Sequence, residues 1–446
     1  MQPSPSDPWR NTKMPTTQPG TLDPAFGPGG EAVLPKIVEE HPDLTVRHHI
    51  KGLTTDQDGN VLFSAGFYLD ALDSPGHING LGRLDAKGNL DKKFGKNGLV
   101  LDRFVPDLPA GGLRLTVQRD GKILMLGWTW RGLTDPWAVL FIARLNSQGD
   151  LDTDFAEDGV RVLTTHLDDE LMEDSSTVHE QSDGHILITA NYSKRGNTEL
   201  TTGTLFRLRP DGVLDNSFNS DGRLDFKLTD PTAPTAINAC ISQGSDYKIV
   251  IAGHARPAPG LNKALLARLN HDGTLDARFG NAQTPGFHYV EDENVDDHAS
   301  FNDLTQRADG SLVGAGQVGQ DAADIRTRGL LRAITPNGAA HQLFNNGKPL
   351  VSQFESSRDT GWQCIMSTRA GQLVTASTGR GIYVAQFNAD GTLNPAFNNL
   401  GYTYIDSAVV TKPVSLTERG DQRVIVAANI TGVDPDGLGV LRCYFG

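Results

Sequence analysis

Two acidic segments carry the side chains with the clearest capacity for chemistry. The carboxylates are Asp168, Asp169 and Glu173 in the first segment and Asp292, Glu293 and Asp296 in the second. Clustered carboxylates offer the hard oxygen ligands that calcium prefers, so a calcium site is one hypothesis. The ordinary explanation is a pair of solvated loops that aid solubility, and a patch for a basic partner is a third interpretation.

An aromatic group is the second candidate. Trp128 and Trp130 are two residues apart, so an extended strand would place them on one face. Trp137 follows closely, and Tyr68 and Tyr192 occupy the corresponding stretches before and after it. Exposed aromatic rings stack on sugars or grip peptides. These five residues are therefore the best ligand-site candidate, with packing inside the fold as the alternative.

Linear catalytic motifs add nothing to these two candidates. The chain lacks H-E-x-x-H, Cys-x-x-Cys, G-x-S-x-G and Walker patterns. Its three cysteines, Cys240, Cys364 and Cys443, share no spacing, which argues against a disulfide framework and favours buried free thiols. A fold that gathers distant residues could still form an active site, so an enzyme is not excluded.

The candidates lie in a chain that repeats itself about every 60 residues. One landmark is a phenylalanine, found at Phe26, Phe94, Phe155, Phe218, Phe279, Phe344 and Phe397. A second landmark, a turn followed by a short apolar run, precedes it in each unit, as in Asp120-Gly121-Lys-Ile-Leu-Met-Leu. An Asp-Gly turn between apolar runs is typical of a β-hairpin. The sequence therefore predicts seven units made of strands.

The two ends of the chain predict how these units are joined. Residues 20–26 supply the second half of the motif, and residues 440–445 supply the first half. A ring needs its last unit completed from both termini, whereas a linear array needs two caps. We therefore predict an all-β, seven-bladed propeller of four-stranded blades. The segment around Glu31 to Leu34 would be the outer strand of the blade built from the C-terminal strands.

A recurring pair of charges supports this register. An arginine precedes an aspartate by eight residues in four units: Arg83 and Asp91, Arg144 and Asp152, Arg207 and Asp215, and Arg268 and Asp276. Across the proposed closure, Arg442 would take Asp23. In two units both the arginine and the aspartate are replaced. Ala333 and His341 stand at these positions in one unit, and Gln386 and Asn394 in the other. Paired change predicts a contact across a hairpin, and we interpret it as a structural ion pair rather than a catalytic one.

The pattern R-L-x-x-x-G-x-L-D-x-x-F-x-x-x-G, seen in residues 83–98, resembles the delta-60 repeat of bacterial proteins. The resemblance extends over about residues 20–446, with departures in the fifth and sixth units. It implies a β-propeller domain whose function is mostly unknown. It implies no catalytic residues.

Composition limits the partners. The 446 residues carry a net charge of −14, which disfavours nucleic acids and anionic membrane surfaces. No apolar run is long enough to span a membrane, and no apolar leader is found, so we expect a cytoplasmic protein or one exported without a classical signal peptide. Residues 1–19 are expected to be a disordered leader and residues 20–446 a single domain.

The predicted topology favours one face for function. In a four-stranded blade the two regular turns emerge on one face and the two irregular connections on the other. Variable loops on a rigid scaffold usually carry binding. We therefore expect a non-catalytic recognition or scaffold propeller that binds a protein or glycan through its irregular face. The alternative is a cation-dependent hydrolase or lyase with acidic residues near the axis.

Overall fold

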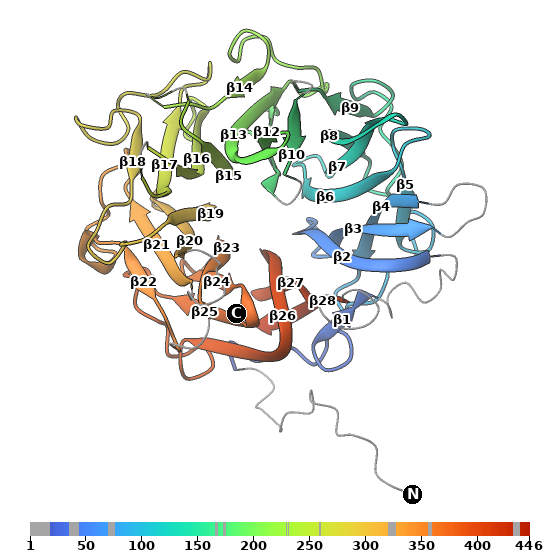
Figure 1. Ribbon diagram of the computed structural model, residues 1–446. Coiled ribbons are helices and arrows are strands. Elements are labelled where there is room, and N and C mark those ends of the chain that lie inside the picture. Colours follow the sequence, from blue (N-terminus) through green and yellow to red (C-terminus); the bar gives the residue numbers. More distant parts are fainter. Residues whose placement is uncertain are drawn as a thin grey trace, which may run out of the picture.

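Seven four-stranded antiparallel blades surround a common axis in the computed structural model (Figure 1). The structure describes residues 18–34, 44–69, 76–165, 168–172, 175–228, 230, 232–257, 260–319, 327–355, 359–430 and 438–446. The predicted seven-bladed, all-β propeller is confirmed. The predicted leader falls almost entirely outside these residues.

The first three blades follow one another along the chain. Blade 1 contains β2 (Leu44–Thr55), β3 (Val61–Leu69), β4 (Gly76–Leu84) and β5 (Leu99–Asp102). Blade 2 contains β6 (Ala110–Val117), β7 (Ile123–Gly132), β8 (Asp135–Leu145) and β9 (Val160–Leu163). Blade 3 has two inner pieces, β10 (Asp169–Leu171) and β11 (Thr177–Glu180), then β12 (Ile186–Lys194), β13 (Asn197–Leu208) and β14 (Arg223–Asp225).

The remaining blades continue the order. Blade 4 contains β15 (Thr235–Gln243), β16 (Lys248–Ala255), β17 (Lys263–Leu269) and β18 (Phe287–Tyr289). Blade 5 contains β19 (Ala299–Gln306), β20 (Leu312–Val318), β21 (Arg328–Ile334), the 3-10 helix η2 (Asn345–Gly347) and β22 (Leu350–Ser352). Blade 6 contains β23 (Trp362–Ser367), β24 (Leu373–Ser377), β25 (Gly379–Phe387) and the first part of β26 (Tyr402–Glu418), whose second part opens blade 7 before β27 (Arg423–Ile430) and β28 (Leu438–Phe445).

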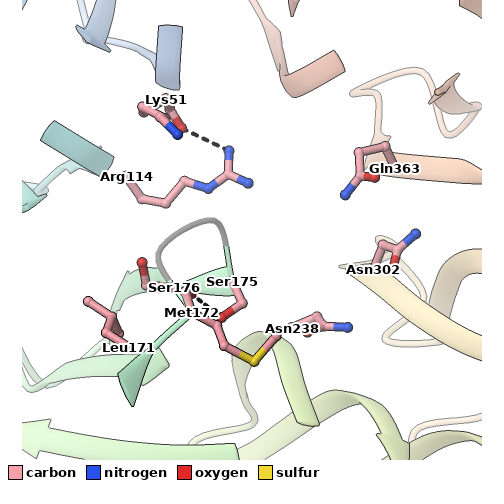
Figure 2. Close-up of a pocket in the computed structure, with 9 residues that line it drawn as sticks. All are labelled: Lys51, Arg114, Leu171, Met172, Ser175, Ser176, Asn238, Asn302 and Gln363. Atoms are coloured by element: carbon pink, nitrogen blue, oxygen red, sulfur yellow. Dashed lines mark hydrogen bonds between the residues drawn. The ribbon is translucent and has the colours of Figure 1, made fainter. Parts of the chain in front are cut away.

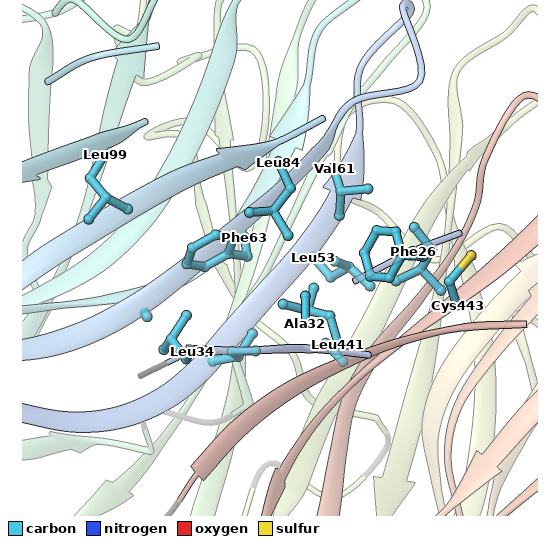
Figure 3. Close-up of a cluster of buried hydrophobic side chains, with 14 of the residues drawn as sticks. Phe26, Ala32, Leu34, Leu53, Val61, Phe63, Leu84, Leu99, Leu441 and Cys443 are labelled. Atoms are coloured by element: carbon cyan, nitrogen blue, oxygen red, sulfur yellow. The ribbon is translucent and has the colours of Figure 1, made fainter. Parts of the chain in front are cut away.

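The N-terminal segment closes the ring as the sequence predicts. Strand β1 (Glu31–Val33) pairs antiparallel with β28, with Ala32 opposite Leu441. Phe26, Ala32 and Leu34 are buried in a cluster that joins blade 7 to blade 1 (Figure 3). The outer strand of the last blade therefore comes from the opposite end of the chain.

The repeated phenylalanines fill the spaces between blades. All seven are at most 1% exposed. Each ring lies against the motif glycine of the next blade around the ring, in the pairs Phe26–Gly88, Phe94–Gly149, Phe155–Gly212, Phe218–Gly273, Phe279–Gly338, Phe344–Gly391 and Phe397–Gly20. A Cβ added to any of these glycines would lie 3.3 Å or less from the ring, and all seven have positive φ. The last pair, Phe397 with Gly20, shows that the N-terminal segment makes the same contact with blade 6.

The predicted charge pairs are contacts across the outer hairpins. Four arginines contact the aspartates eight residues later, in the pairs Arg83–Asp91 (2.8 Å), Arg144–Asp152 (2.7 Å), Arg207–Asp215 (2.6 Å) and Arg268–Asp276 (2.9 Å). In blade 6 the Asn394 amide donates to Gln386 Oε1 at 2.6 Å, which preserves the contact without charge.

Two ion pairs join the N-terminal segment to the C-terminal strands of blade 7. The sequence suggested Asp23 as the partner of Arg442; the structure pairs Asp23 with Arg423 at 2.9 Å and Arg442 with Glu31 at 2.5 Å. Glu31 lies directly opposite Arg442 in the β1–β28 ladder, which explains that contact. The three cysteines are buried and free, as expected.

Candidate functional site

The first strand of each blade lies nearest the axis (Figure 1). Six of these inner strands contain a register shift in the same part of the strand, three to five residues before the strand ends. The residues left without a direct ladder partner include Lys51, Arg114, Asn238, Asn302, Gln363 and Val414. A β-bulge of this kind redirects a side chain that regular pairing would hold in the sheet.

Five of the bulge residues line an axial pocket of about 510 Å³. They are Lys51, Arg114, Asn238, Asn302 and Gln363, and blade 3 contributes Leu171, Met172, Ser175 and Ser176 from the break between β10 and β11 (Figure 2). The volume lies in the range of ordinary small-ligand sites. Six blades thus build one concave wall.

Hydrogen bonds to neighbouring inner strands fix the amides of this wall. Asn238 Nδ2 donates to the Phe301 carbonyl at 2.7 Å, and Asn302 Nδ2 donates to the Trp362 carbonyl at 2.9 Å. Each acceptor immediately precedes the next bulge residue along its strand. Asn238 Oδ1 also accepts from Asn191 Nδ2 at 3.0 Å. An amide has two N–H donors and a carbonyl acceptor, so these bonds orient each group and use only part of its hydrogen-bonding capacity.

The guanidinium of Arg114 is fixed in a similar way. Its Nη1 donates to the carbonyls of Lys51 (3.1 Å) and Val414 (2.6 Å), which belong to blades 1 and 7. Lys51 itself lies beside it on the same wall (Figure 2). The pocket therefore presents two neighbouring cations in a protein whose net charge is −14.

Asp303 is a partly buried carboxylate that directly follows the wall residue Asn302. Its Oδ1 accepts from the Leu304 amide (2.8 Å) and its Oδ2 from the Ile365 amide (2.9 Å). Burial raises the pKa of Asp303 to about 6, while the two amides and the charge of Arg114 act in the opposite direction. None of the described residues lining the pocket is a carboxylate.

The predicted aromatic group is divided between two faces of blade 2. Trp128 and Trp130 share one face of β7, as expected, and are partly buried. Trp128 packs against the cluster shared by blades 2 and 3. Ala138 is the ladder partner of Trp130, so Trp137 must point to the other face, where the guanidinium of Arg195 lies 4.3 Å from its ring centre.

The two predicted tyrosines lie in the second strands of blades 1 and 3. Tyr192 on β12 is 3% exposed and belongs to the core cluster between blades 2 and 3. Burial raises its phenol pKa above the ordinary value. Tyr68 lies on β3, opposite His77, and its side chain is outside the described residues.

The acidic segments are separate, and several of their carboxylates have basic partners. Asp169 contacts Lys194 at 2.6 Å, and Arg328 donates to Asp296. Asp292 Oδ1 accepts from the backbone and side chain of Asn294, while Asp168 and Glu293 are exposed. Glu173 falls outside the described residues, within which no group of three or more potential metal ligands occurs. The calcium hypothesis stays untested.

The axial bulge residues were not identified from sequence, although a signal existed. Lys51, Arg114, Ser176, Asn238, Asn302 and Gln363 follow one another at almost the repeat spacing. Five of them lie in inner strands, and Ser176 lies between the two inner pieces of blade 3, directly before β11. Alignment of the units on their inner strands, rather than on the phenylalanine motif, would have displayed this polar column.

The fold defines the chain as a β-propeller, and its inner strands surround an axial pocket. Four segments, 118–155, 181–218, 244–279 and 370–397, match the model of a β-propeller domain of unknown function, DUF5122. The first three segments start at or next to the turn between the first two strands, and all four end at the motif phenylalanine. These matches cover less than half of the chain and support a propeller family without an assigned activity.

Solved structures resemble the chain at the level of fold. A protein of unknown function from Dyadobacter fermentans has 11% identity and a TM-score of 0.40, with coverage of 91% of this chain and 100% of that one. A polysaccharide lyase, an ulvan lyase, has 8% identity and a TM-score of 0.47 (96% and 93% covered). An α-L-arabinanase from Penicillium chrysogenum has 9% identity and a TM-score of 0.45, with coverage of 91% of this chain and 94% of that one. Similarities of this size carry no inference about function.

No curated protein matches the sequence. Within the described part of the chain, no helix has the length and apolar character needed to cross a membrane.

Proposed function

We propose that the protein is a non-catalytic recognition module that takes the end of a glycan into the axial pocket. The observation that carries this proposal is the composition of the wall: amide, hydroxyl and cationic side chains from six blades surround about 510 Å³. Sugars are recognised through many hydroxyl groups, each of which needs a donor or acceptor at a set position. Polar groups held by a rigid scaffold supply these positions with little loss of conformational entropy on binding.

The location of the bulges supports an approach from the irregular face. In β6, β15, β19 and β23 the bulge lies within the first five residues of the inner strand, where the irregular connection from the preceding blade enters. The β7–β8 hairpin, which carries Trp130 and Trp137, is also an irregular connection. We propose these two rings as contacts for the part of a longer glycan that extends beyond the pocket.

A screen of the full-length protein against a glycan array, followed by thermal-shift titration, tests the proposal. A ligand at 100 times its Kd adds about 2.7 kcal/mol to the folded state, enough to detect. Gln363→Trp would fill the pocket and should abolish the shift. Trp130→Ala is the matched control on the same face and should weaken binding several-fold at most.

Two outcomes would count against the axial site. Undiminished binding by Gln363→Trp, with loss in Trp130→Ala, would assign the ligand to the aromatic hairpin instead. Release of a shortened glycan, lost in Asp292→Asn, would instead support the cation-dependent hydrolase or lyase that the acidic segments suggested.

A further inference from the structure

A second, smaller pocket lies on the irregular face, between blades 4 and 5. Its walls are the β16–β17 connection, the start of β17, the β18–β19 connection and the start of β19. Its volume of about 260 Å³ is below the range of about 300–1,000 Å³ that is usual for sites enclosing a whole small molecule. A pocket of this size suits one side chain of a partner protein.

The buried part of this pocket is apolar. Val290 and Ala299 are 3% and 2% exposed and belong to the core cluster shared by blades 4 and 5, against which Val295 packs. Leu261, which also lines the pocket, is 45% exposed. An incoming side chain with a long carbon chain would therefore find an apolar surface to cover, and removing that surface from water favours binding.

One charge pair in the pocket is internally satisfied. Lys263 contacts Glu291, and its ammonium nitrogen lies 5.6 Å from the centre of the Tyr289 ring. The two charges cancel, so this pair adds no net charge to the pocket.

Two further carboxylates line the pocket and keep their charge. Neither Asp292 nor Asp297 forms an ion pair within the described ranges of the chain. Asp292 Oδ1 accepts the backbone amide of Asn294 at 3.1 Å, and Asp297 Oδ1 accepts that of His298 at 2.6 Å. Neutral amides orient a carboxylate without removing its charge. The buried Arg332 interacts electrostatically with Asp292 without an ion pair, so it offsets only part of one of the two charges.

We propose that this pocket binds an arginine side chain of a partner protein. The carbon chain of that arginine lies along Leu261 and Val295, and its guanidinium meets Asp292 and Asp297. A guanidinium is planar, weakly hydrated and carries five N–H donors, so it can serve two carboxylates beside an apolar surface better than a strongly hydrated ammonium can. This inference does not depend on glycan binding, because it concerns a different part of the irregular face.

Three blocked tripeptides test the assignment: acetyl-Gly-Arg-Gly-amide and the versions in which citrulline or lysine replaces arginine. Citrulline has nearly the shape of arginine but no charge. NMR titration of the full-length protein, labelled at leucine and valine methyl groups, should show shifts at Leu261, Val290 and Val295 with millimolar arginine peptide. We expect the citrulline peptide to bind about tenfold more weakly and the lysine peptide to fall between them. Added NaCl should weaken the arginine peptide, because salt screens charge pairs.

Variants in one loop connect the binding to the pocket. Asp292→Asn and Asp297→Asn each remove a charge and keep the oxygen that accepts the neighbouring amide. Each should weaken the arginine peptide several-fold and leave the citrulline peptide unchanged. Glu293→Gln is the matched control: Glu293 is exposed in the same loop and does not line the pocket, so its loss of charge should change the affinity little.

Several outcomes would overturn the assignment. Equal affinity for the arginine and citrulline peptides would show that the pocket does not recognise charge, and tighter binding of the lysine peptide would exclude arginine as the preferred side chain. Equal weakening by Glu293→Gln and Asp292→Asn would indicate attraction to the acidic surface in general. No methyl shift with any peptide would also count against it. The peptide comparison uses the wild type, so it decides the question even where a variant does not fold.

Discussion

The repeated arginine is the residue that ties each outer hairpin to the next blade. Arg207 illustrates its role: it is fully buried, pairs with Asp215, and lies 4.9 Å from the centre of the Phe218 ring. Its Nη1 donates to the carbonyl of His271 in the following blade. One side chain therefore satisfies a carboxylate, covers the motif phenylalanine and connects two blades, which explains why the motif keeps all three residue types together.

Blade 6 suggests how this pair can be replaced. We predict that Arg207→Gln alone lowers the free energy of unfolding by about 3–5 kcal/mol, because it leaves a buried carboxylate poorly compensated. Adding Asp215→Asn should recover part of the loss through an amide pair like that of Gln386 and Asn394. Urea unfolding of both single variants and the double variant gives the coupling energy, expected at about 1–3 kcal/mol. Additive effects would show that the two residues act independently.

The inner strands are the elements in which prediction from sequence was incomplete. The Asp-Gly turns and the phenylalanine spacing identify strands two to four of each blade because turns and buried rings have strong residue preferences. A bulge has no comparable preference, since its extra residue points away from the sheet. Lysine, arginine, asparagine and glutamine all occupy it here. The strands were thus predictable, while the pocket that their bulges form was not.

Three partly buried histidines predict sensitivity to acid. Burial lowers the pKa of His179 to about 4, with the charge of Arg119 adding to the effect, and burial likewise lowers the pKa values of His254 and His288 to about 4. His179 Nε2 accepts the Ser242 amide across β11 and β15 at 3.2 Å, which requires the neutral ring.

The sign of the pH effect follows from these shifts. A histidine with a folded pKa below its unfolded value of about 6.5 contributes stability that is present above pH 6.5 and is lost as pH falls toward 4. Asp303, with a pKa of about 6, opposes this, because its contribution is present below about pH 4 and is lost as pH rises through 6. Three histidines outweigh one aspartate, so stability should fall between pH 6.5 and 4.

Urea unfolding of the wild type and His179→Gln at pH 7, 6 and 5 checks this prediction. Glutamine can still accept the Ser242 amide but does not titrate. The variant should therefore lose less stability than the wild type as the pH falls. The difference is up to about 1.4 kcal/mol per pH unit, because the variant lacks one titrating group. A variant as sensitive to acid as the wild type would show that His179 does not contribute to the effect.

At the scale of the whole molecule, the two ends of the chain complete one blade. This was predictable because the motif is split between residues 20–26 and 440–445, and a ring is the arrangement that rejoins the halves. The backbone confirms the connection: Asn398 N donates to the Pro19 carbonyl at 2.8 Å, and Asp23 N to the Cys443 carbonyl at 2.8 Å. The same contacts that join adjacent blades elsewhere thus also join the termini.

A matched pair of substitutions measures how much this closure stabilises the ring. Phe26 in the N-terminal segment and Phe94 in blade 1 hold equivalent positions, and both are fully buried. Phe94→Ala should lower the free energy of unfolding by about 3–5 kcal/mol, the usual cost of emptying a buried aromatic site. If the N-terminal segment is as firmly bound as an internal one, Phe26→Ala should cost the same.

A much smaller cost, together with early hydrogen exchange of the Ala32 and Val33 amides, would mean that the segment detaches before the ring unfolds. Closure would then be a separate step from propeller folding, and the edge of β28 would be open to another strand.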